Sequence, residues 1–246
     1  MTRSPADLLE TWITAQAPDH ADWLRDQLAL LDSGKAERDL HIFLGLAPRK
    51  LGKADLTLTG PDLSDADAAH PGWTPQGWSI DGAARVLGLL RFKSARPFAE
   101  LFKDLRRTSD AGELVALYRG LPLYPQPDAL DFEVGEGLRS NLKPVFEAIA
   151  HNNPYPRDHF DQHRWNHMIL KALFVGSTLA PITGLQQRAN PELARILVDY
   201  ALERWAAGRV VSDELWIPVR PFRDAPEVKA LLERARADGH LKEALT

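Results

Sequence analysis

Apolar residues recur at helical spacing along most of the chain, and single Pro and Gly residues separate the periodic stretches. A spacing of three to four residues places apolar side chains along one side of an α-helix, whereas strands alternate apolar with polar residues. Such alternation is almost missing from this sequence. The pattern therefore predicts an all-α fold of several helices without a substantial sheet. Helix pairs of similar length are also compatible with a solenoid-like stack.

The periodic stretches give the expected positions of the helices. They are residues 5–13, 23–31, 40–46, 80–90, 98–105, 114–118, 137–150, 160–174 and 191–207. We expect Pro48 to end the third helix, because proline interrupts a helix interior. Polar and turn-forming residues dominate 51–78, which is predicted to be the longest loop.

Three prolines occur in residues 121–130 and forbid a helix there. The sequence thus indicates a single all-helical domain over residues 1–246, or two helical halves that meet near 121–136.

Composition narrows the classes of protein and of site. Lys and Arg number 30 against 34 Asp and Glu, a net charge of −4, so the chain lacks the basic field that nucleic-acid binding requires. The sequence has no Cys, which excludes disulfides and thiolate metal sites. A signal peptide and an apolar run of about 18 residues are both missing from it. We expect a cytoplasmic protein with no nucleic-acid partner and no transmembrane segment.

Nucleotide-binding and hydrolase motifs are missing as well. The sequence contains no GxxxxGK, no GxGxxG after a strand, no HExxH and no GxSxG. We therefore expect no cofactor, and the sequence leaves open whether the protein is an enzyme.

Residues 160–174 carry apolar side chains in nearly every direction around the helix axis, which predicts a central helix. Asn166, His167 and Lys171 are its polar exceptions. Desolvation would lower the pKa of Lys171 and make its amine a candidate base or nucleophile. The alternative is that its long side chain reaches the surface.

Three histidines recur every four residues, His159, His163 and His167, and would share one helix face. Such spacing suits a divalent metal. No acidic residue accompanies them at that spacing, and the alternative is a set of surface or capping histidines. We expect no metal site.

The helix predicted over 191–207 has Asn190 as N-cap and Pro191 in its first turn. Arg204 falls on the same bearing as Leu193 and Leu197, so it is predicted to face inward. A buried arginine needs a carboxylate, a group of carbonyls or a bound anion. The alternatives are an ion pair with Glu147, Asp161 or Glu203, or an escape to solvent.

Several runs of residues resemble the EboA family. They are NPYP at 153–156, WNxMxLKALF at 165–174, GLxxRANPELAR at 184–195 and DYxxERWAAGR at 199–209 with ELW at 214–216. The similarity covers most of the chain and weakens before about residue 45. It implies a pathway encoded in bacterial clusters for an isoprenoid- or cyclitol-like secondary metabolite, and it supplies no catalytic residue. Leu202 stands where the family pattern has His, and His167 stands where it has Gln. The resemblance therefore supports no histidine site at either position.

Two functions follow from these observations. The first is a helical protein that binds or processes a small anionic or hydroxylated metabolite. Its pocket would be lined by six polar residues, with Lys171 as the catalytic candidate: Arg139, Asn141, Asn153, Asn166, Lys171 and Arg204. The alternative is a non-catalytic helical scaffold that binds other pathway proteins, with four tryptophans as anchors if they are exposed: Trp73, Trp78, Trp205 and Trp216.

Overall fold

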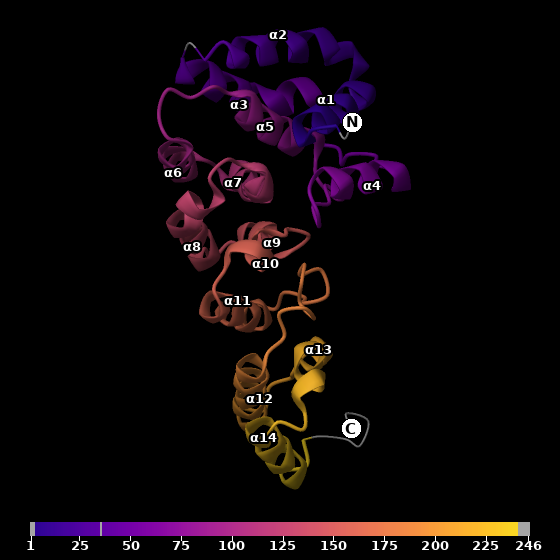
Figure 1. Ribbon diagram of the computed structural model, residues 1–246, viewed down its shortest axis with the longest axis vertical. Coiled ribbons are helices and arrows are strands. Elements are labelled where there is room, and N and C mark those ends of the chain that lie inside the picture. Colours follow the sequence, from indigo (N-terminus) through magenta and orange to yellow (C-terminus); the bar gives the residue numbers. More distant parts are fainter. Residues whose placement is uncertain (1–2, 35, 241–246) are drawn as a thin grey trace. The chain divides into compact units, whose positions relative to one another are not determined.

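The computed structural model describes residues 3–34 and 36–240. These residues form α-helices and short 3-10 helices, and the part described contains no strand beyond one isolated antiparallel bridge between Asp55 and Ser79. The predicted all-α fold is confirmed. The chain divides into two compact units, Met1–Tyr155 and Pro156–Thr246 (Figure 1). The proline-rich segment 121–136 lies inside the first unit.

The helices follow one another with short connections. In the first unit they are α1 (Pro5–Gln16), α2 (Ala21–Asp32), α3 (Glu37–Leu51), α4 (Gly60–Ala69), α5 (Ile80–Arg91), α6 (Phe98–Thr108), α7 (Ala111–Arg119), α8 (Asp131–Arg139) and α9 (Lys143–Ala150). After them come α10 (Tyr155–His159), α11 (Gln162–Phe174), α12 (Pro191–Ala206), α13 (Trp216–Val219) and α14 (Pro226–Ala237).

Helix α5 forms the core of the first unit. Every residue from Ile80 to Leu89 is buried, and α1, α3 and α7 pack around the helix (Figure 1). Small residues allow this close packing, as Gly88 illustrates. A Cβ atom at that position would lie 2.4 Å from the ring of Phe43.

The helix over 160–174 was predicted to be the central one, but α11 leaves Phe174 74% exposed, so that prediction was wrong.

Helix α3 continues through Pro48, where the sequence predicted its end. In an α-helix the N–H of residue 48 would donate to the carbonyl oxygen of Leu44, and proline has no N–H. The Nε atom of Arg85 donates to this oxygen instead, at 3.2 Å. Arg85 also pairs with Asp81 at 2.6 Å, and the two side chains are only 8% and 7% exposed. A buried arginine of α5 thus supplies the donor that Pro48 lacks.

Two further predictions of element position were wrong. Residues 51–78 include α4, which begins with a capping box between Thr59 and Asp62. The predicted helix 137–150 consists instead of the end of α8 and a separate α9, which has Pro144 in its first turn. In both cases the prediction missed the start of a helix. Each of these helices has a proline in its first turn, where proline is well tolerated.

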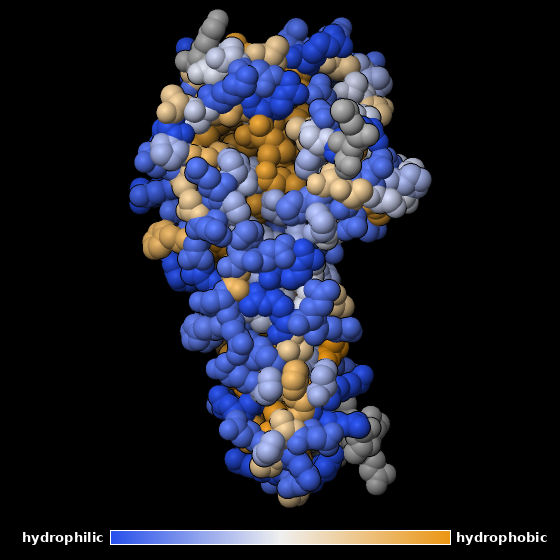
Figure 2. Space-filling view, in the orientation of Figure 1, coloured by the Kyte–Doolittle hydropathy of each residue, from blue (hydrophilic) through white to orange (hydrophobic). Residues whose placement is uncertain are grey.

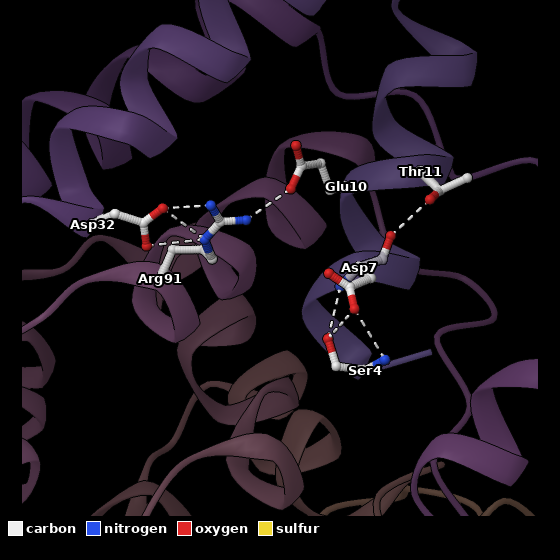
Figure 3. Close-up of polar contacts among 6 residues, drawn as sticks. All are labelled: Ser4, Asp7, Glu10, Thr11, Asp32 and Arg91. Carbon is white, nitrogen blue, oxygen red and sulfur yellow. Dashed lines mark hydrogen bonds and ion pairs between the residues drawn. The ribbon is translucent and has the colours of Figure 1, made fainter. Parts of the chain in front are cut away.

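The N-terminal helices are joined to α5 by polar contacts (Figure 3). Ser4 and Asp7 form a capping box that starts α1. Arg91, near the end of α5, donates to Asp32 of α2 at 3.0 Å and to Glu10 of α1 at 2.9 Å. The hydrogen bond from Arg91 lowers the pKa of the Asp32 carboxyl below its usual value. One guanidinium therefore links three helices.

Substitution Arg85→Met should strongly destabilise the protein, because it leaves the Asp81 carboxylate buried without its cation. We expect the free energy of unfolding, measured by urea denaturation, to fall by about 3–5 kcal/mol. Introducing Pro48→Ala should reduce that cost by about 1 kcal/mol, because the new N–H reaches Leu44. The exposed pair of Arg25 and Asp22 provides the control Arg25→Met, which should cost at most about 1 kcal/mol. Equal losses of unfolding free energy in Arg85→Met and Arg25→Met would contradict this role of Arg85.

The Arg91 contact should make stability depend on pH. A carboxyl whose pKa is lowered by folding stabilises the protein above its unfolded pKa of about 3.9, and this contribution is lost as the pH falls through the lower folded value. Arg91→Met should therefore cost about 1 kcal/mol at neutral pH. The difference from the unsubstituted protein should shrink below about pH 4. Urea denaturation at a series of pH values measures this difference, and one that stays constant would refute the prediction.

Candidate functional site

A cavity of about 390 Å³ opens in the second unit, between the α11–α12 loop and α13. Its apolar lining comes from Ala180, Ile182, Leu185 and Ile217. Small-molecule pockets in proteins typically have volumes of about 300–1,000 Å³ and mainly apolar walls. We call this cavity, with its seven lining residues, the loop pocket.

The remaining lining residues of the loop pocket are Gly184, Gln186 and Gln187. The two glutamine side chains are exposed, and each offers two N–H donors and one carbonyl acceptor. None of the seven described lining residues carries a charge. The pocket therefore combines an apolar surface with two neutral hydrogen-bonding groups.

The wall of the loop pocket is a run of turns tied to the rest of the unit. Within it, Ile182 N donates to Leu179 O at 2.9 Å, and Arg188 N donates to Gly184 O at 2.9 Å. The backbone N–H of Leu179 donates to the carboxylate of Glu214, just before α13. Gly184 has a φ of +83°, and a Cβ there would lie 2.7 Å from Cγ of Arg157. Only glycine suits this close approach at a positive φ.

Arg188 fixes the end of the same loop. Its guanidinium carbon lies 4.8 Å from the ring centroid of Trp165, which is fully buried on α11. Its Nη1 donates to the carbonyl oxygens of Pro156 at 2.9 Å and Arg157 at 3.2 Å. Burial lowers the pKa of the Arg188 guanidinium, while the charges of Asp161 and Asp158 oppose this shift. The guanidinium keeps its charge, since arginine does not lose its proton in proteins.

The start of α12 is held by a pair of asparagines. Asn190 accepts from Leu193 N at 2.9 Å and so caps the helix, as the sequence predicts. Its Nδ2 donates to Oδ1 of Asn166 at 2.9 Å, and Asn166 is 1% exposed on α11. Asn166 was a predicted ligand-binding residue, and the structure gives it a structural partner. The asparagine pair and Arg188 together fix the C-terminal end of the loop between α11 and α12.

Three predicted site residues lie in the first unit. Arg139 is exposed and donates to Glu136 at 3.0 Å, and Asn141 is exposed in the turn between α8 and α9. Asn153 is buried, donates to the carbonyl oxygens of Tyr118 and Ala148, and accepts from Tyr155 N. Its amide therefore completes backbone hydrogen bonding.

The other two predicted residues lie in the second unit. Lys171 is partly buried on α11, and desolvation lowers the pKa of its amine below its usual value. Arg204 lies partly exposed in the last turn of α12, where it donates to the carbonyl oxygen of the exposed Val210 at 3.0 Å. None of the six predicted residues lines the loop pocket.

The three histidines do not share one helix. His159 ends α10, whereas His163 and His167 lie exposed on α11 with ring centroids 4.2 Å apart. Phe160 and Asp161 separate the two helices, so the predicted common face was wrong. Among the described residues, no three His, Asp or Glu side chains gather as a metal-ion site.

The four tryptophans named as possible anchors are mainly core residues. Trp73, Trp78 and Trp216 are at most 5% exposed, and Trp205 is partly exposed and stacks on Trp216. Three of the four are thus not accessible to a protein partner.

A second cavity lies in the first unit, beside Arg85. Four leucines line it together with Arg85, Ser109 and Glu113: Leu44, Leu89, Leu105 and Leu117. Its volume of about 10 Å³ holds no more than one water molecule. Figure 2 shows apolar residues at the base of a hollow on one face of this unit, within a hydrophilic rim. The loop pocket is the larger of the two described cavities.

Sequence reasoning missed Gln186, Gln187 and Arg188 as site residues. The two glutamines are the unspecified positions of the run GLxxRANPELAR, and Arg188 is its first specified charge. They lie outside the periodic segments, so a search for polar residues on apolar helix faces passes over them. The available signal was Arg188, a charged residue two positions before the N-cap residue Asn190.

Comparisons with known proteins give one match. The family model described as "Metabolite traffic protein EboA" matches residues 5–220, which include all seven residues that line the loop pocket. No curated protein and no solved structure matches the chain. Among the described helices, none has the length and apolar character needed to cross a membrane.

Arg188→Met should loosen the wall of the loop pocket. The substitution removes two hydrogen bonds to carbonyls and the contact with the Trp165 ring, and we expect a loss of about 2 kcal/mol in the free energy of unfolding. Amide hydrogen exchange should accelerate in residues 179–188. The control is Arg195→Met, which removes a surface pair with Asp199 and should cost at most about 1 kcal/mol. Unchanged exchange in 179–188 would show that Arg188 does not hold the loop.

Proposed function

Because the chain belongs to the EboA family of metabolite traffic proteins, we propose that it binds a small metabolite in the loop pocket and carries it without chemical change. The observation that supports this proposal most is the loop pocket itself, with its volume of about 390 Å³ and its mixed lining. The bacterial secondary-metabolite pathway that the family resemblance implies is part of the same proposal, and the ligand would be one of its anionic or hydroxylated intermediates.

The fixed wall of the pocket supports binding. Arg188, Gly184 and Glu214 anchor the loop at separate points. A preformed pocket pays less conformational entropy when a ligand arrives, so more of the contact energy appears as affinity. This arrangement suits a protein whose task is to retain a molecule.

The chemistry of the lining favours transport over reaction. The seven described residues are Ala, Ile, Gly, Leu and Gln, and none of these side chains exchanges a proton near neutral pH. General acid–base and nucleophilic catalysis both need such a group within hydrogen-bonding distance of the substrate. We therefore propose that Lys171 is not a catalytic residue of this pocket.

Filling the loop pocket tests the proposal. Protein purified under non-denaturing conditions from the cells that encode it should carry a small molecule detectable by native mass spectrometry. Ala180→Phe places a ring in the pocket and should reduce the retained molecule at least about tenfold, because the apolar surface is no longer accessible. Ala206→Phe is the matched control, since Ala206 is exposed at the end of α12 and does not line the pocket.

The proposal makes a sharp distinction between these two variants. Equal retention by Ala180→Phe and Ala206→Phe would place the metabolite elsewhere and contradict the proposal. Unsubstituted protein that carries no small molecule would contradict it as well. Circular dichroism and thermal unfolding of both variants establish that a loss of ligand is not a loss of fold.

A further inference from the structure

We infer that the loop pocket selects an uncharged metabolite with an apolar body and a hydroxyl or carbonyl group, and that Gln186 and Gln187 recognise this polar group. The inference rests on the proposed function, because it names the ligand class for the same pocket. It chooses between the anionic and the hydroxylated ligand that the sequence left open.

The apolar lining sets the first requirement. Ile182, Leu185 and Ile217 offer aliphatic side chains from both the loop and α13. Burying an apolar ligand surface against them is favourable by about 25 cal/mol for each Å² removed from water. A highly hydrated ligand gains little from such walls.

The charges around the pocket disfavour an anion. A carboxylate or phosphate that leaves water needs a cation or several hydrogen-bond donors. Arg188 directly follows the pocket residue Gln187, but its guanidinium donates to two backbone carbonyls. The side chain that ties the pocket wall to the chain before α13 is the acidic Glu214. Neither Arg188 nor Glu214 lines the loop pocket, so its described lining supplies no cation to an anionic ligand.

The two glutamine amides suit a neutral polar group. No other described residue hydrogen-bonds to the side chain of Gln186 or Gln187, and both line the pocket. A hydroxyl group both donates and accepts, and a primary amide offers the complementary acceptor and donor. A hydroxyl or carbonyl thus satisfies these amides without bringing charge into the pocket.

Three probes with one rigid skeleton test the inference: 2-naphthol, 2-naphthyl phosphate and naphthalene. At pH 7 the first is neutral with a hydroxyl, the second is an anion and the third has no polar group. We expect purified protein to bind 2-naphthol about five- to tenfold more tightly than naphthalene, as one hydrogen-bonded group contributes. The phosphate should bind more weakly than 2-naphthol by at least about tenfold, measured by isothermal titration calorimetry.

Two variants assign the preference to the glutamines. The double variant Gln186→Leu with Gln187→Leu should bind 2-naphthol and naphthalene equally, because the donors and acceptors are gone while apolar surface remains. Gln76→Leu is the control, since Gln76 is exposed in a loop of the first unit, and it should keep the preference for 2-naphthol. An unchanged preference in the double variant would overturn the role of the glutamines.

The outcomes separate this inference from the proposed function. Tighter binding of the phosphate, abolished by Ala180→Phe, would overturn the inference and leave the loop pocket as a metabolite site. Binding of all three probes that Ala180→Phe does not change would contradict both. If none of the probes binds, the inference fails, and the retained metabolite alone decides the proposed function.

Discussion

The position of the α11–α12 loop in the second unit depends on the contact of Arg188 with Trp165. The guanidinium lies 4.8 Å from a buried indole and donates to the carbonyl oxygens of Pro156 and Arg157. A single side chain thereby ties the α11–α12 loop to α11 and to the chain before it. The same loop supplies most of the lining of the loop pocket. Without this tie the pocket wall would be a long surface loop, and such loops are usually mobile.

Arginines complete backbone hydrogen bonding in both units, and this changes how inward cations in the sequence should be interpreted. Arg85 donates to Leu44, whose usual helical donor is missing at Pro48, and Arg204 donates to Val210. A buried cation among apolar residues invites the hypothesis of an anionic ligand. In this protein the acceptors for Arg85, Arg188 and Arg204 include backbone carbonyls, which need no ligand. Arg85 and Arg188 therefore have structural roles in this protein.

Helical periodicity was sufficient to predict the fold class and most helix positions, because burial of one face is a local property of the sequence. It failed where a distant residue decides the outcome. Pro48 does not end α3, since Arg85 replaces the missing donor. The helical wheel likewise singled out Asn166, whose partner is Asn190. Gln186 and Gln187 were missed because a loop has no periodicity, and only the folded chain brings them to the same cavity as Ile217.

The central claim is that an uncharged molecule with a hydroxyl group binds in the loop pocket, and methyl NMR of isoleucine-labelled protein tests it most directly. Ile182 and Ile217 line the pocket, whereas Ile80 and Ile149 are buried in the first unit. Titration with 2-naphthol should shift the methyl signals of Ile182 and Ile217 in a saturable manner and leave those of Ile80 and Ile149 in place. Saturable shifts confined to Ile80 and Ile149, or no saturable shift at Ile182 and Ile217, would contradict the claim.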